Sequence, residues 1–282
     1  MKKKIAITTE SSVDLSKEMQ TSFGIRVIPM NIYIADEEYK DGVNLNAKEL
    51  YEKSQLYGTM PGTASISPHE YRKLFEKLTD DGFDVVHISI SSLLSSCFQN
   101  AGFAAGSFEN VYVIDSRTLS AGMALLAIKA SKLRNEGSSA EKIVEELEKL
   151  KTKISTSFIL DDTEYLYKGG RCSKLEKTGA ELFSIKPSVE VTDGALQPGK
   201  KFMGKNLQAQ KRYIDERVKR EKSIDDSLCL LNYSDMERED VDALVEHLKK
   251  SYPFKRVIVN EAGCCISAHC GRGCMGIIYA RK

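Results

Sequence analysis

The 282-residue chain has no tryptophan, only four histidines and almost no net charge, with 41 lysines and arginines against 40 aspartates and glutamates. A formal charge of +1 gives none of the positive surface that nucleic acids or anionic membranes attract. No apolar run approaches the roughly 20 residues that span a bilayer. The basic start Met1–Thr9 lacks the features of a signal peptide and instead predicts a first strand. We expect a cytoplasmic protein with no nucleic-acid partner and no transmembrane segment.

The seven cysteines are an odd number, and their spacing is not that of a disulfide framework. A chain of this length does not need such cross-links, so reduced thiols are the simpler expectation. Hydrophobic residues make up 41% of the chain and charged residues 29%. This composition allows a packed core and one large domain or two ordinary ones.

Strand-like and helix-like segments alternate, which predicts an α/β fold with at least part of the sheet parallel. The expected strands are short apolar or extended runs: Lys4–Thr9, Ile25–Ile34, Asp84–Ile90, Val111–Asp115, Leu228–Asn232 and Arg256–Asn260. One amphipathic helix is expected to begin at a capping box in Ser138–Glu141 and to carry apolar residues as far as Ile154. Another is expected around Val241–Leu248.

The region Lys168–Lys205 differs from the rest, because it is basic, glycine-marked and has Asp193-Gly194 as a hairpin turn signal. We therefore place a domain boundary near residue 155. One domain is expected over residues 1–155 and a second over residues 156–282.

The segment Ile88–Ala101 begins as a buried strand, breaks into paired serines and resumes as a helix. Backbone N–H groups at a helix N-terminus, together with serine hydroxyls, can hold an anion. The segment contains no Lys or Arg, so an anion bound there would be held by neutral donors. Neutral donors suit a single carboxylate better than a polyphosphate. The alternative is that the serines only cap the helix.

The C-terminal run Gly271–Gly276 matches G-x-G-x-x-G, but only six residues follow it. No helix, second strand or acidic ribose ligand fits there, so it is not a dinucleotide fingerprint. Its glycines are expected to let a loop pass close to a ligand or another backbone. Four cysteines surround His269 without a C-x-x-C pair, so they are either small core residues or metal ligands: Cys264, Cys265, Cys270 and Cys274.

Three further residues stand out by context. His269 is the histidine embedded in glycine-rich sequence and is the one we favour for chemistry, although a structural role is the alternative. In the loop before a helix start, Ser67 and Glu70 form a capping box, which leaves Thr63 without a structural role. Arg171 follows two glycines, which predicts a tight turn that displays its charge.

Seven segments occur in the order of the motifs of the DegV family of bacterial lipid-binding proteins, and the chain resembles that family nearly end to end. They are Thr8–Leu15, Thr63–Ser67, Ile90–Ala101, Val113–Gly122, Leu166–Ser173, Ile185–Pro187 and Ala268–Gly276. The chain departs from the family pattern at several places. Glu10 replaces an Asp, Ala64 a Ser, Cys97 a Thr, and Leu93 and Ser96 replace two glycines.

The resemblance implies an N-terminal three-layer α/β/α domain with a parallel sheet and a C-terminal two-layer α/β domain with a mixed sheet. It also implies a long-chain fatty acid in a buried tunnel between these domains. The family's carboxylate contacts fall here on Thr63 and Ser95, with His269 in the same network, and we expect the neighbouring Ser96 to contribute.

Some members of the family are carrier subunits of a bacterial fatty-acid kinase. They present the bound carboxylate to an ATP-dependent partner, which makes an acyl phosphate. Arg171 occupies a position implicated in docking that partner, and Lys205 falls near a second one.

The resemblance therefore implies a non-catalytic carrier, with a fatty acid as its ligand and no cofactor or metal. The alternative is a serine-dependent hydrolase or acyl transferase that uses Ser95 and His269. Against it, the chain has no G-x-S-x-G elbow and no evident carboxylate to orient the histidine. No P-loop or protein-kinase signature appears, so the chain is not expected to phosphorylate anything itself. A metal or redox protein built on the C-terminal cysteines is the third hypothesis.

Overall fold

The computed structural model describes residues 4–172 and 185–282. A four-stranded sheet, in the order β2-β1-β6-β7, is parallel throughout. Its strands are β1 (Lys4–Glu10), β2 (Ile25–Ile28), β6 (Phe83–Ser89) and β7 (Val111–Asp115). The two central strands are buried along most of their length, as expected of parallel strands that are covered on both faces.

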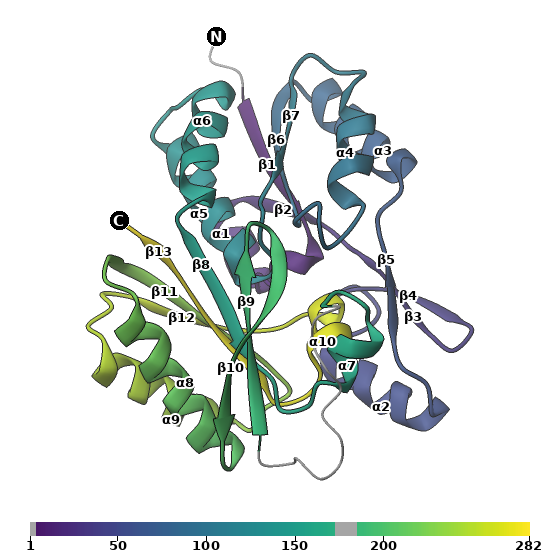
Figure 1. Ribbon diagram of the computed structural model, residues 1–282. Helices are drawn as coiled ribbons and strands as arrows, with labels where there is room; N and C mark the ends of the chain where they lie inside the picture. The colour runs from purple at the N-terminus through teal and green to yellow at the C-terminus, as the bar shows by residue number, and fades with distance from the viewer. Residues whose placement is uncertain (1–3, 173–184) are drawn as a thin grey trace.

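Helices cover both faces of this sheet (Figure 1). On one side lie α3 (Pro68–Asp80) and α4 (Cys97–Ala105). On the other lie α5 (Ala121–Asn135) and α6 (Ala140–Lys151), and α1 (Lys17–Phe23) lies beside β2. This arrangement makes the three layers that the family resemblance implies.

The predicted strand Ile25–Ile34 is in fact two strands in different sheets. β2 ends at Ile28, and β3 (Asn31–Ile34) pairs antiparallel with β4 (Glu37–Lys40) and β5 (Gly62–Ala64). Pro29 lies between them, and a proline has no N–H to donate to a strand ladder. Helix α2 (Ala47–Tyr57) contacts β3.

The second large sheet has the order β10-β9-β8-β13-β11-β12 and is mixed, because β11 and β12 are parallel and the other neighbours are antiparallel. Its strands are β8 (Ile154–Ile159), β9 (Ile185–Thr192), β10 (Ala195–Met203), β11 (Ile224–Ser234), β12 (Val257–Glu261) and β13 (Cys274–Arg281). Helices α8 (Asn206–Arg220) and α9 (Arg238–Ser251) pack together on one face. The predicted fold class, α/β with one parallel and one mixed sheet, is confirmed.

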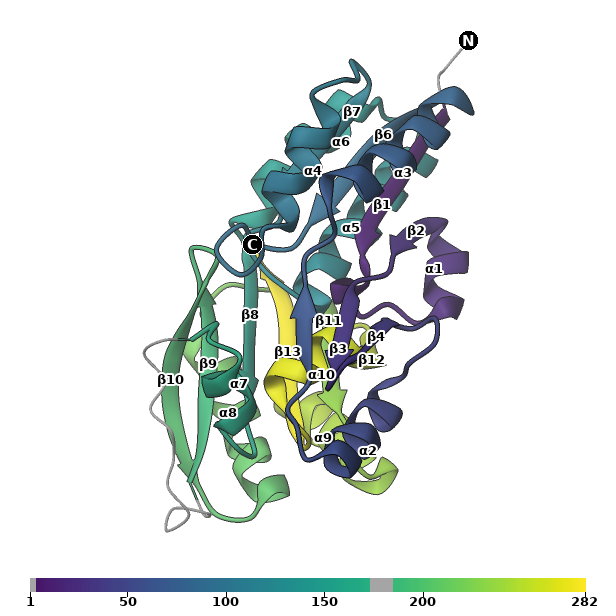
Figure 2. The same cartoon turned by 90° about the vertical axis from the view of Figure 1, so that its right-hand side faces the viewer.

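Helix α5 lies between the two large sheets, and Figures 1 and 2 show the parallel sheet above it and the mixed sheet below. Eleven of its 15 residues are buried, because it contacts β1 and β6 on one side and β8, β11 and β13 on the other. One core cluster accordingly joins Ile7 of β1 to Phe158 of β8. The chain changes sheet between α6 and β8, near residue 155, but the shared core leaves the domain boundary there a prediction.

Several local expectations are corrected. Helix α6 ends at Lys151, and Ile154 begins β8 instead of extending the helix. Its N-cap is Ser139, whose hydroxyl accepts from the N–H of Lys142, so the predicted capping box at Ser138–Glu141 is wrong. The turn at Asp193-Gly194 between β9 and β10 is confirmed, with positive φ angles of 50° and 85°.

Three short helices complete the described elements: η1 (Ser11–Val13), α7 (Glu164–Lys168) and α10 (Cys264–Cys270). His269 therefore lies in a helix, not in the loop that the sequence predicts. The family-like segment Leu166–Ser173 continues past Cys172, and its last residue lies outside the described residues. None of the helices in the described ranges has the length and apolar character needed to cross a membrane.

Candidate functional site

The leading candidate site is a cavity whose walls come from both halves of the molecule. Its empty space is about 920 Å³, a figure that includes the part open to solvent. Most of its wall is apolar, with side chains from the loop after β6, from α7, α10, β8, β10 and β13: Ile90, Leu94, Phe158, Leu166, Leu196, Ile266 and Ile278. Among its polar lining residues are Thr63, Ser95, Arg171 and His269.

Thr63 and His269 are in direct contact, although 206 residues separate them in the chain. The hydroxyl of Thr63, on β5, lies 2.9 Å from Nε2 of His269, near the end of α10. Burial of the imidazole, with the nearby positive charge of Arg171 adding to it, lowers the pKa of His269 to about 4. The ring is therefore neutral at pH 7, and its Nδ1 is buried with no hydrogen-bond partner among the described residues.

The two glycines before Arg171 have distinct structural roles. A Cβ at Gly169 would lie 2.4 Å from Nδ1 of His269, so only glycine lets α7 approach the imidazole this closely. Gly170 follows with φ +68°, in the left-handed region that favours glycine. The guanidinium of Arg171 donates to the carbonyl of Gly169 at 2.7 Å. Arg171 is thus exposed, as expected, yet it also lines the cavity beside His269.

Ser95 belongs to the loop between β6 and α4. Its hydroxyl lies 3.2 Å from the sulfur of Cys97 and accepts from the Cys97 N–H at 3.3 Å. A thiol sulfur is a weak acceptor, so the Ser95 hydroxyl hydrogen is available to a better one. The Ser95 N–H donates to the carbonyl of Ser91 at 3.2 Å, so this amide is not the additional anion donor that the sequence suggests.

The other two predicted residues lie away from the cavity wall. Ser96 is exposed at the N-cap of α4, where its side chain makes no capping hydrogen bond. Lys205 is exposed at the N-cap of α8. The structure therefore gathers Thr63, Ser95, Arg171 and His269 around one cavity and leaves Ser96 and Lys205 outside its lining.

The alternative hydrolase needs a serine whose hydroxyl contacts the histidine. Among the described residues, no hydrogen bond joins Ser95 to His269. The serine hydroxyl bonds Cys97, and the Nε2 of the histidine bonds Thr63. The arrangement places the Ser95 hydroxyl against Cys97 and the His269 imidazole against Thr63, on the wall of one cavity.

Two carboxylates that sequence reasoning did not single out fix the position of α10. Asp41 accepts from the N–H groups of Cys264 at 2.8 Å and Cys265 at 3.2 Å, and Asp14 accepts from the Gly263 N–H at 2.8 Å. Burial, with the charge of Asp41 adding to it, raises the pKa of Asp14 well above its ordinary value. No local pattern links these residues to α10, because Asp41 and Cys264 are 223 positions apart.

Glu10, which replaces the family's Asp, is a third buried carboxylate of this kind. It is fully buried at the end of β1 and accepts from the Tyr71 hydroxyl at 2.6 Å, the Ser89 hydroxyl at 2.6 Å and the His87 ring at 3.0 Å. It also accepts from the N–H of Ile90 at 3.0 Å. The longer side chain thereby fixes the start of the loop that carries Ser95.

The seven cysteines all lie in the described ranges and are buried as free thiols. Within those ranges, no group of three or more His, Cys, Asp or Glu side chains is placed to hold a metal ion. The glycines after His269 allow close approach, as expected: a Cβ at Gly271 would meet the Tyr165 ring at 2.9 Å, and one at Gly276 would meet the Ser157 carbonyl at 2.8 Å.

Comparison with known proteins agrees with this fold. A DegV domain-containing protein of Caldanaerobacter subterraneus is 31% identical over 281 residues, which are 99% of each chain. Protein DegV of Bacillus subtilis is 28% identical over 283 residues, again 99% of each chain.

Two solved structures superpose over nearly the whole chain. One is a DegV family protein from Thermus thermophilus whose structure is described in terms of its fatty acid binding. It has a TM-score of 0.85 at 25% identity, and the superposition covers 99% of this chain and 100% of that one. DegV of Bacillus subtilis, described as a fatty acid binding protein, has a TM-score of 0.84 at 27% identity with the same coverage. A family model described as "Uncharacterised protein, DegV family" matches residues 4–282, and the chain belongs to the DegV family.

Proposed function

We propose that this chain binds a long-chain fatty acid in the cavity between the two large sheets, with the carboxylate at Thr63 and Ser95 and with His269 in the same hydrogen-bond network. The observation that carries the proposal is a mostly apolar cavity that meets a small set of neutral hydrogen-bond donors. Burial of an acyl chain stabilises a complex by about 0.8 kcal/mol per CH2, provided that the carboxylate keeps its hydrogen bonds. The fatty acid binding described for the Thermus and Bacillus relatives supports the same ligand class.

The neutral state of His269 determines how the donors would act. A neutral imidazole donates from one ring nitrogen only. With its hydrogen on Nε2, His269 donates to the hydroxyl oxygen of Thr63, 2.9 Å away. The Thr63 hydroxyl hydrogen is then free for a carboxylate oxygen, and the Ser95 hydroxyl turns from the Cys97 sulfur to the same ligand. Nδ1 stays an unprotonated acceptor against Gly169, which offers it no donor.

Titration of delipidated protein with palmitic and oleic acids tests this site. Thr63→Val and Ser95→Ala should each weaken binding by about 1–3 kcal/mol, because each removes a hydrogen bond to a buried charged group. Ser96→Ala is the comparison variant, since Ser96 neighbours the site but does not line the cavity. Mass spectrometry of an organic extract should show a fatty acid in the protein as purified.

Two results would contradict the assignment. Failure of saturated and monounsaturated chains to bind the delipidated protein would exclude the ligand class. If Thr63→Val and Ser95→Ala both kept the parental affinity and Ser96→Ala lost affinity, the carboxylate would bind at Ser96 and not at Thr63 and Ser95.

We further propose that the chain presents this carboxylate to an ATP-dependent fatty-acid kinase subunit, with Arg171 and Lys205 as docking contacts. Both side chains are exposed, and Arg171 also lines the cavity. A basic residue at that place can orient an acidic partner surface beside the carboxylate.

Arg171→Ala separates docking from ligand binding. If Arg171 docks the partner, fatty-acid affinity should stay near the parental value, while acyl-phosphate formation with a cognate kinase falls. Lys205→Ala, off the cavity wall, should behave in the same way. Equal losses of affinity and turnover in Arg171→Ala would make Arg171 a ligand contact, and acyl phosphate formed from ATP and magnesium without a partner would contradict the carrier role.

A further inference from the structure

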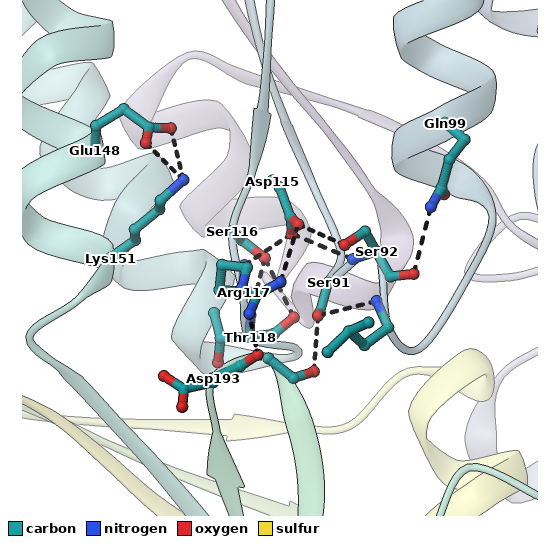
Figure 3. A network of polar contacts seen from close by, with 12 residues as sticks. Ser91, Ser92, Gln99, Asp115, Ser116, Arg117, Thr118, Glu148, Lys151 and Asp193 are labelled. Carbon is teal, nitrogen blue, oxygen red and sulfur yellow. Dashed lines mark hydrogen bonds and ion pairs between the residues drawn. The ribbon is translucent and has the colours of Figure 1, made fainter.

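The tip of the β9–β10 hairpin is fastened to the parallel-sheet half of the molecule (Figure 3). The hydroxyl of Ser91 donates to the carbonyl of Gly194 at 2.7 Å, and the guanidinium of Arg117 donates to the carbonyl of Asp193. We call these four residues the clasp. Ser91 and Arg117 lie just after β6 and β7, so the clasp joins the two halves across the cavity.

The clasp residues line neither the cavity nor a second pocket beside it, but their chain neighbours Leu93 and Ala195 line that second pocket. This second pocket, the vestibule, shares three lining residues with the main cavity, Leu94, Arg171 and Leu196. One wall of this vestibule is the start of β10, from Ala195 to Gln197, directly after the hairpin turn. Movement of the hairpin tip would therefore change the width of the vestibule.

The clasp adds polar contacts to the hairpin tip, whose residues Val191 and Leu196 also pack against the main core. Within the described residues, β8 pairs with β9 only at Ser188–Glu190, so the segment from Val191 to Leu196 extends past the rest of the sheet. Among the strands that the structure describes, β10 is at the edge of its sheet and pairs with β9 alone. A segment with so few backbone partners opens more readily than the central strands.

The clasp is closely fitted and locally strained. Arg117 has a positive φ angle of 54°, which is uncommon for a residue other than glycine, whereas the φ of 50° at Asp193 is ordinary for an Asp-Gly hairpin turn. A Cβ at Gly194 would lie 2.7 Å from the Ser91 hydroxyl and 3.0 Å from Nε of Arg117. Asp115 holds the Arg117 side of the clasp in place by accepting from the Arg117 N–H at 3.0 Å. Strained residues held by their surroundings are a feature of segments that switch.

Ser91 also orders the loop that carries Ser95. Its hydroxyl accepts from the N–H of Leu93 at 3.3 Å, and its carbonyl accepts from the N–H groups of Leu94 and Ser95 at 2.9 and 3.2 Å. The residue that fastens the hairpin thus also shapes the loop proposed to bind the carboxylate. The Ser91 hydroxyl holds the hairpin and the Leu93 N–H, while the Ser91 carbonyl holds the rest of this turn.

We propose that the clasp is an access gate to the cavity: the hairpin tip separates from Ser91 and Arg117 to admit and release the ligand, and the closed clasp retains it. The identity of that ligand rests on the proposed fatty-acid binding, but the gate itself does not. The gate acts on rates of exchange, since the clasp lies outside the donor group formed by Thr63, Ser95 and His269.

Natural thiols provide a test that needs no ligand. Cys265, Cys270 and Cys274 line the cavity, whereas Cys229 is buried in the separate core beneath α8 and α9. In Arg117→Ala and Ser91→Ala, methyl methanethiosulfonate should label the three cavity thiols about fivefold faster, the effect of losing one typical hydrogen bond. Labelling of Cys229, read by mass spectrometry of the same sample, should keep the parental rate.

Arg212→Ala is the matched control, because Arg212 also donates to a carbonyl of β10, that of Met203 at 2.9 Å, but at the far end of the strand. Its cavity thiols should label at the parental rate. Parental labelling in both clasp variants would overturn the gate. So would equal acceleration of Cys229, since it would show that the contacts only stabilise the whole fold.

Stopped-flow measurements with cis-parinaric acid extend the test to exchange. In Arg117→Ala, entry and release of the probe should both accelerate several-fold, while the dissociation constant changes less than either rate. Faster release with an unchanged rate of entry would overturn the gate, because it describes a lost ligand contact. If the thiols respond as expected and the probe does not bind the parent protein, the fatty-acid proposal fails while the gate stands.

Discussion

At the scale of single residues, His269 links the site to pH. Its folded pKa, lowered to about 4 by burial and by Arg171, lies below its ordinary value of 6.5. Between pH 6.5 and pH 4 this histidine is protonated in the unfolded chain but neutral in the folded one. The free energy of unfolding therefore falls as the pH falls through this range. His269→Gln should remove up to about 2.4 kcal/mol of that pH dependence between pH 7 and pH 4.5, as measured by urea unfolding.

The control is His69→Gln, because His69 is exposed in the first turn of α3. It should leave the difference between the two pH values unchanged. If His269→Gln retained the full parental difference, other groups would account for the acid sensitivity and His269 would not be held neutral by the fold.

The sequence identifies single residues when a local pattern leaves one unexplained. Thr63 stands out because Ser67 and Glu70 account for the rest of its loop, and the structure does place Thr63 in the cavity. Asp14 and Asp41 could not be found in this way, because the amides that they accept from lie more than 200 positions away. Contacts of that range are products of the tertiary fold and leave no spacing in the sequence.

At the scale of elements, α7 positions the imidazole through Gly169. The glycine has a helical φ of −66°, so alanine suits its backbone, but the added Cβ would lie 2.4 Å from Nδ1 of His269 and 3.0 Å from the Tyr165 carbonyl. We expect Gly169→Ala to displace the ring and to weaken fatty-acid binding at least tenfold in titration calorimetry, the effect of losing about 1.4 kcal/mol. Gly102→Ala in α4, where nothing lies within 4 Å, should bind as the parent does. Unchanged affinity in Gly169→Ala would show that the close approach is not needed.

The same scale shows which elements the sequence predicts. β1, β6 and β7 could be predicted because each contains a short apolar stretch, Ile5–Ile7, Val85-Val86 and Val111–Ile114, of the kind that buried parallel strands carry. Helix α10 does not, because its seven residues are too short for helical periodicity. Asp14 and Asp41, from the other half of the chain, accept hydrogen bonds from its first N–H groups. The helix therefore depends on tertiary contacts, which local sequence patterns do not reveal.

At the scale of the whole molecule, the continuous core decides how the two halves unfold. One core cluster joins Ile7 and Ile88 of the parallel sheet to Phe158 and Ile278 of the mixed sheet, with α5 between them. We expect delipidated protein to unfold in a single calorimetric transition whose van't Hoff and calorimetric enthalpies agree. A fatty acid bound between the halves should raise the Tm of that one transition, since ligand at 100 times its Kd stabilises the folded state by about 2.7 kcal/mol. Two separate transitions, only one of them shifted by the ligand, would instead establish independent domains divided near residue 155.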